Sequence, residues 1–168
     1  MLSADRLIAA LDLRPLPREG GYYRETYRSA DVLPAAPLPA GYSGGRSMAT
    51  AIYYLLTPET FSALHRLPAD EVFHFYLGDP LEMLQLPPGG PGRVITLGTD
   101  LGAGQQPQLI VPRGVWQGSR LVPGGAFALL GTTMAPGFDF ADYQAGDRAS
   151  LRRDYPDFAD LIERLTPP

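Results

Sequence analysis

From residue 48 to residue 134 the chain consists of short apolar or alternating runs, each followed by residues that favour turns. Alternation places apolar and polar side chains on opposite faces of a strand, and Pro, Gly and Asp between the runs are typical of tight connections. Many short strands with no helical pattern between them predict a sandwich or barrel, not a parallel α/β sheet. The expected strands are residues 48–56, 61–67, 72–77, 81–86, 93–97, 108–111, 115–121 and 127–134.

Helical patterns occur only near the two ends of the chain. Ser3 is a suitable N-cap for a short helix that ends before Pro15. Residues 156–165 begin with Pro and carry an apolar stripe, which predicts an amphipathic helix packed outside the sheets. Between these ends, residues 19–29 predict an aromatic-rich strand after a Gly pair, and residues 30–46 predict a long loop without periodicity.

Composition narrows the class of protein. The 168 residues, 45% of them hydrophobic, suffice for one core, so residues 1–168 are expected to form a single domain. The sequence has no Cys and no Lys, which excludes disulfides, thiolate nucleophiles and lysine Schiff bases. Its net charge of -4 offers no basic field for nucleic acid. Since it also lacks a signal-peptide pattern and an apolar run of about 18 residues, we expect a cytoplasmic protein outside the membrane.

Both histidines lie within residues 65–78, together with two acidic residues. Strand parity predicts that His65 and Glu71 meet inside the barrel, whereas His74 has the opposite parity and points to the other face. Imidazole and carboxylate groups bind metals and transfer protons near neutral pH, so this window is the expected centre of the chemistry. The inward face is expected to carry Phe61, Ala63, His65, Leu67, Glu71, Phe73, Phe75 and Leu77.

The same window resembles the first cupin motif, His-x-His, three or four residues, Glu, six residues, Gly. His65, Glu71 and Gly78 match this pattern, but Leu67 stands at the second His position. The second cupin motif, Pro-x-Gly-x-x-His, is matched by residues 112–117 with Gln117 in place of His. Two of the four usual metal-ligand positions are therefore replaced.

A narrower resemblance covers almost the whole chain. Four blocks in order are similar to those of a family of uncharacterised small cupins: EGGYYRETY at 19–27, DEVFHFYLG at 70–78, VPRGVWQ at 111–117 and APGFDF at 135–140. This resemblance implies an all-β cupin jelly-roll barrel (double-stranded β-helix) with the short terminal helices packed outside. It also implies a homodimer and a pocket that has been likened to those of dTDP-sugar epimerases.

The first functional hypothesis is general acid–base chemistry without a tightly bound metal. In this hypothesis His65 is the base, Glu71 orients it, and Gln117 holds an oxygen of the substrate. Tyr23 or Tyr76 would return a proton. The expected result is epimerisation or isomerisation of a small polar molecule that is sugar-like or anionic.

Two alternatives use the same residues. His65 and Glu71 are equally suited to be a satisfied polar pair in a barrel that binds a small molecule without catalysis. A metal-dependent cupin enzyme would hold a divalent cation through His65, Glu71 and Gln117. Gln117 is a weak ligand for such a cation and Leu67 supplies none, so a metal-free site is the first expectation and a divalent metal the second.

Further candidate ligand-binding residues are Tyr23, Arg24, His74, Trp116 and Asp139, in addition to Gln117. Arg24 and Arg28 are expected on one strand face, where two guanidinium groups could clamp a phosphate or carboxylate, although two such groups on an exposed face are more often only solvated. His74 and Trp116 suit packing or an interface as well as a ligand. Asp139 could close the mouth of the pocket or cap the following segment.

Overall fold

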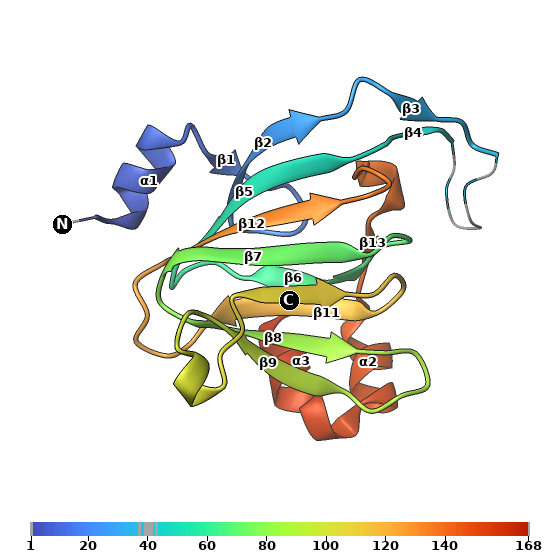
Figure 1. Cartoon of the computed structure of the whole chain (residues 1–168). Coiled ribbons are helices and arrows are strands. Elements are labelled where there is room, and N and C mark those ends of the chain that lie inside the picture. Colours follow the sequence, from blue (N-terminus) through green and yellow to red (C-terminus); the bar gives the residue numbers. More distant parts are fainter. Residues whose placement is uncertain (1, 37, 39–41, 43, 168) are drawn as a thin grey trace.

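The computed structural model describes residues 2–36, 38, 42 and 44–167, which form two large antiparallel sheets that face each other (Figure 1). The first sheet has the strand order β1 (Arg14–Pro15), β2 (Tyr22–Arg28), β5 (Thr50–Leu56), β12 (Ala128–Met134), β7 (Glu71–Gly78) and β10 (Gln108–Val111). The second sheet has the order β13 (Gln144–Ala145), β6 (Ser62–Arg66), β11 (Trp116–Leu121), β8 (Leu81–Leu86) and β9 (Arg93–Leu97).

The main hydrophobic core lies between the two sheets. It joins Tyr54 and Phe73 of the first sheet to Met83 and Leu121 of the second. Alternation along the strands supplies these side chains, because every second residue faces the opposite sheet. The predicted all-β jelly-roll barrel is confirmed, and the eight runs predicted from residue 48 onward agree with its strands to within about two residues at each end.

Short helices cover the outside of the barrel, as predicted (Figure 1). Helix α1 (Ala4–Ala10) begins where the Ser3 hydroxyl accepts the Arg6 N–H, and Leu7 packs on the outer side of the first sheet. Helix α3 (Ala159–Arg164), which follows the 3₁₀ turn η3 (Pro156–Phe158), packs with α2 (Arg148–Asp154) on the second sheet. No helix in the described ranges has the length and hydrophobicity of a membrane span.

The helix α2 is absent from the sequence prediction. Its seven residues bury one side chain, Leu151, and the others are polar except Ala149, so no apolar stripe marks it. Two further 3₁₀ turns, η1 (Leu101–Ala103) and η2 (Phe140–Asp142), interrupt connections between strands. The turn η2 follows the APGFDF block and carries residues at the mouth of the barrel.

The predicted loop at residues 30–46 is partly correct. Its ends pair as a small two-stranded sheet, β3 (Val32–Leu33) with β4 (Arg46–Ser47), which projects from the barrel (Figure 1). Residues 37, 39–41 and 43 of this prediction lie outside the described part of the chain.

Three β-bulges change which side chains face inward. In β2 an extra residue, Thr26, lies between the pairs Glu25–Ile52 and Tyr27–Ala51. In β7 the extra residue is Tyr76, and in β6 the pairing shifts between Ser62 and His65. An unpaired residue reverses the parity of everything beyond it, so predictions made by simple alternation fail on one side of each bulge.

For this reason the predicted inward orientation is wrong for two residues, Phe61 and Leu77. Phe61 packs on the outer cluster formed with α2 and α3, while Ser62 takes the inward position next to His65. Leu77 packs on the outer cluster below α1. The other expected inward residues, including Phe73 and Phe75, are buried.

Candidate functional site

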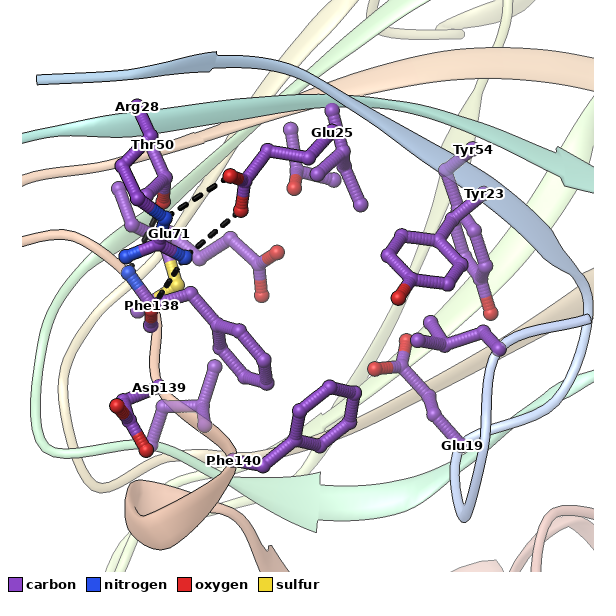
Figure 2. Close-up of a pocket in the computed structure, with 15 residues that line it drawn as sticks. Glu19, Tyr23, Glu25, Arg28, Thr50, Tyr54, Glu71, Phe138, Asp139 and Phe140 are labelled. Atoms are coloured by element: carbon purple, nitrogen blue, oxygen red, sulfur yellow. Dashed lines mark hydrogen bonds and ion pairs between the residues drawn. The ribbon is translucent and has the colours of Figure 1, made fainter. Parts of the chain in front are cut away.

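A cavity of about 370 Å³ opens at one end of the barrel, against the inner face of the first sheet (Figure 2). This volume is in the range of sites for small molecules. Strands β2, β5, β7 and β12 form its wall, and segments near residues 19 and 139 complete it. The lining residues are Leu16, Glu19, Tyr23, Glu25, Arg28, Thr50, Ile52, Tyr54, Leu67, Glu71, Thr132, Met134, Phe138, Asp139 and Phe140.

Glu71 is the predicted residue that combines contact with the cavity and unusual electrostatics. Its carboxylate accepts a hydrogen bond from the Gln117 amide nitrogen, 2.6 Å from Oε2, and the residue is buried. Burial, followed by repulsion from Glu19, raises the pKa of Glu71 to about 7, against the opposing effects of His65 and the Gln117 hydrogen bond. Near neutral pH this carboxyl is therefore present in both protonation states.

His65 lies behind the cavity wall and is almost fully buried. Its Nδ1 donates to the Ala63 carbonyl oxygen at 2.7 Å, which leaves Nε2 as the acceptor in the neutral ring. The Nε2 atom lies 3.5 Å from the Gln117 amide nitrogen. The Tyr143 ring stacks on the imidazole with centroids 4.9 Å apart. A backbone carbonyl, not Glu71, orients the ring, which corrects the predicted direct pairing.

Glu19 is a charged residue of the site that the sequence interpretation missed. One carboxylate oxygen accepts from the Ser62 hydroxyl at 2.8 Å, and the other lies 3.9 Å from His65 Nε2. Figure 2 shows the carboxylates of Glu19 and Glu71 on opposite sides of the open space. The signal for Glu19 was its position before a Gly pair within the first family block, because Gly20 and Gly21 adopt left-handed backbone conformations that turn the chain back into the barrel.

The donor set around Gln117 does not fit a divalent metal ion. The Gln117 amide nitrogen faces both Glu71 Oε2 and His65 Nε2, and an N–H group cannot ligate a cation. The amide oxygen, the atom that could, is buried and has no hydrogen-bond partner within the described structure. Among the described residues no three His, Asp or Glu side chains converge as metal ligands would.

Arg24 and Arg28 lie on opposite faces of β2, so the predicted clamp of two guanidinium groups is wrong. The Thr26 bulge lies between them and reverses the parity. Arg24 lies outside, over the Tyr53 ring. Arg28 lines the cavity, where its Nε and Nη2 donate to the two Glu25 oxygens at 2.9 and 2.7 Å, and Nη2 also donates to the Phe138 carbonyl.

Three other candidates also lie outside the barrel. His74 Nε2 is 3.3 Å from the Thr133 hydroxyl on the outer face of the first sheet, as its parity predicted. Trp116 stacks under the Arg66 guanidinium, 4.5 Å from the ring centroid, next to the outer cluster with α2 and α3. Tyr76 is the bulge residue and is half exposed.

Tyr23 and Asp139 line the cavity. The Asp139 side chain also accepts the Ala141 N–H at 2.8 Å and so caps η2, which means that both predicted positions of this residue are realised. Tyr54 and Tyr143 were not predicted. Burial raises the pKa of both phenols, which keeps them protonated at neutral pH.

Comparison with known proteins assigns the chain to a family. Residues 5–146 match the family model described as Cupin superfamily (DUF985). The chain is 32% identical over 134 residues, 75% of its length and 67% of the relative's, to Uncharacterized protein YML079W of Saccharomyces cerevisiae.

Two solved structures are similar over nearly their whole length. The protein SO0799 of Shewanella oneidensis has a TM-score of 0.86 and 35% identity, covering 100% of this chain and 99% of that one. A hypothetical protein from Leishmania major has a TM-score of 0.87 and 30% identity, covering 98% and 99%. The family match, the curated relative and the observed barrel agree, and the chain belongs to the Cupin superfamily (DUF985).

Proposed function

We propose that the barrel binds a small polar molecule in this cavity and transfers a proton to or from it at Glu71. The observation that carries the proposal is a buried carboxyl that faces a cavity of suitable size and whose pKa is raised to about 7. A catalytic acid or base is most effective when its pKa is near the working pH. Epimerisation or isomerisation of a hydroxyl-bearing ligand is the reaction class that such a group serves.

In this proposal Glu71 and His65 exchange the roles expected from the sequence: Glu71 transfers the proton, and His65 is a positioning residue. Glu71 touches the ligand because it lines the cavity, whereas His65 is separated from it. His65 and Gln117 are positioning residues: Gln117 holds the Glu71 carboxylate, and the Ala63 carbonyl fixes the imidazole behind it. Tyr23 lines the same cavity and is the phenol available to donate a second proton, whereas the Tyr54 hydroxyl donates to the Gly20 carbonyl at 3.0 Å.

Hydrogen–deuterium exchange tests the catalytic step even when the reaction product is unidentified. Protein in D₂O is incubated with a panel of aldoses, ketoses and hydroxy acids, and NMR follows loss of signal at ligand C–H positions. We expect at least one compound to exchange, and Glu71→Gln to slow that exchange by about 10²–10⁴-fold. The control is Glu163→Gln, an exposed glutamate on α3.

The alternative outcomes are distinct. Ligands that bind in the cavity but exchange no C–H hydrogen would indicate a non-catalytic binding protein. If exchange persists in the Glu71→Gln variant, Glu71 is not the group that transfers the proton.

We also propose that two copies associate through the outer face of the first sheet. The support is the family resemblance and the exposure of three large hydrophobic residues on strands of this sheet, Tyr27, Tyr76 and Ile110. Light scattering should give twice the mass of one chain, and Ile110→Glu should reduce it to one. A monomer at micromolar concentration would contradict this proposal.

A cytoplasmic location stays a prediction, to be checked by cell fractionation.

A further inference from the structure

We propose that the cavity selects a small organic cation, a molecule with a protonated amine, over neutral and anionic molecules of the same shape. This inference rests on the proposed function, since it names the ligand class of the same cavity. It differs from the sugar-like or anionic ligand expected from the sequence, and the reason is the charge and the aromatic content of the lining.

The lining is strongly acidic. Four carboxyl groups line the cavity, those of Glu19, Glu25, Glu71 and Asp139, and among the described lining residues Arg28 is the one cation. The Arg28 guanidinium is bound to both oxygens of Glu25 and to the Phe138 carbonyl. An incoming anion would therefore have to displace Glu25, while Glu19 and Glu71 would repel it.

Burial strengthens the electrostatic effect of this charge imbalance on a ligand. The Glu19 side chain is only 13% exposed; one carboxylate oxygen accepts from the Ser62 hydroxyl and the other lies 3.9 Å from His65 Nε2. Charges interact more strongly in such a site than in water, because the surrounding dielectric constant is lower. A bound ammonium group between Glu19 and Glu71 would find acceptors on both sides, with the N–H groups to use them.

The walls add a second, independent attraction for a cation. Tyr23, Phe138 and Phe140 turn their rings toward the open space in Figure 2. The Phe138 and Phe140 rings meet edge to face with centroids 5.0 Å apart. The negative face of an aromatic ring attracts a cation, and a group of rings next to carboxylates is a common receptor for amines. Apolar side chains such as Leu16 and Ile52 leave room for the carbon body of the ligand.

A matched fragment screen tests this inference. The library contains amine, alcohol and carboxylate versions of the same scaffolds, for example glucosamine, glucose and glucuronate, or phenethylamine, 2-phenylethanol and phenylacetate. Binding is measured at about pH 7.5 by ligand-observed NMR and calorimetry. We expect the amine of a binding scaffold to bind at least about tenfold more tightly than the alcohol, and the carboxylate to bind more weakly than either.

Variants that replace a lining carboxylate by a neutral amide show which residues cause the preference for amines. Glu19→Gln keeps an acceptor for Ser62, and Asp139→Asn keeps the cap of η2, so both preserve the local hydrogen bonds. Each should weaken amine binding about five- to tenfold and leave alcohol binding unchanged. The matched control, Glu163→Gln on the exposed surface of α3, should change neither.

The two proposals fail in different ways. A cavity-filling variant, Ile52→Trp, identifies hits that bind in the barrel, because Ile52 lines the cavity. If alcohols or carboxylates bind as tightly as amines and are lost in Ile52→Trp, the charge selection is wrong and the small-molecule site stands. If no fragment of any charge binds, or if none is lost in Ile52→Trp, both proposals are wrong.

Discussion

The Gln117 amide nitrogen lies 2.6 Å from Oε2 of Glu71 and 3.5 Å from Nε2 of His65, so that one amide bridges the carboxyl and the imidazole. The amide nitrogen is thus a common neighbour of the two groups. Glu71 is the member of the set that lines the cavity. The barrel therefore keeps the polar centre of a cupin, but Gln117 supplies an amide donor at the position where the second cupin motif has a histidine.

The raised pKa of Glu71 predicts a distinct pH dependence of stability. The unfolded carboxyl has its ordinary pKa of 4.5 and the folded one a pKa of about 7, so the folded protein holds this proton more tightly. The stabilisation is complete below pH 4.5 and is lost as the pH rises through 7. Relative to Glu71→Gln, the free energy of unfolding of the wild type should fall by roughly 3 kcal/mol between about pH 4.5 and pH 8.

Urea unfolding at several pH values measures this difference. Glu163→Gln, on the exposed surface, should follow the wild type at every pH. Parallel curves for the wild type and Glu71→Gln would show that the carboxyl titrates normally in the folded protein.

Restoring histidines at the two replaced positions should create a metal site. Leu67 lines the cavity and Gln117 lies beside His65 and Glu71, so Leu67→His combined with Gln117→His would add two imidazoles to the existing pair. We expect elemental analysis to find less than about a tenth of an equivalent of Mn, Fe, Ni or Zn in the wild type, and about one equivalent in the double variant. A stoichiometric metal in the purified wild type would contradict the metal-free interpretation.

The ion pair between Arg46 and Asp142 should hold the mouth of the cavity in place. The two side chains are 6% and 4% exposed, and Arg46 Nε donates to Asp142 Oδ2 at 2.7 Å. They join β4 to η2, the turn that begins with Phe140. Breaking a buried pair leaves one charge uncompensated, so Asp142→Leu should destabilise the fold by about 3–5 kcal/mol.

The exposed pair Arg152–Glu163, with side chains 45% and 54% exposed, is the matched control. Glu163→Leu should cost less than about 1 kcal/mol. Adding Arg46→Met to Asp142→Leu should recover most of the lost stability, because it removes the unpaired charge. Urea unfolding measures these changes in the free energy of unfolding. If Asp142→Leu and Glu163→Leu lower it equally, burial does not determine the strength of the two ion pairs.

Removing the carboxylate of Glu25 should change the charge preference of the cavity. Glu25 accepts two hydrogen bonds from Arg28, and Glu25→Gln would leave the guanidinium with a neutral neighbour. Carboxylate fragments should then gain about five- to tenfold in affinity, while amine fragments should lose affinity. Calorimetry on the matched fragments measures both changes, and an unchanged ratio of the two affinities would show that Arg28 takes no part in binding.

The strands of the barrel could be predicted from the sequence because their signals are local. Residues 81–86, 93–97 and 108–111 match β8, β9 and β10 at both ends. Alternation reports which face a strand buries, and Pro or Gly at its ends stops the pairing, so both signals are independent of the rest of the fold. Strand parity for His65 and Glu71, and the cupin resemblance for Gln117, likewise pointed to residues that are buried in the barrel.

Which side chains reach the cavity depends on the assembled barrel. A bulge depends on how two distant strands pair, and each extra residue reverses the parity beyond it; Thr26 thus brings Arg28 inward and leaves Arg24 outside. The loop that carries Glu19 enters the barrel because it contacts Ser62, 43 residues away in sequence. The family, the strands and the buried polar set follow from local pattern and are therefore written in the amino-acid sequence. The composition of the cavity follows from long-range pairing, which no local pattern records.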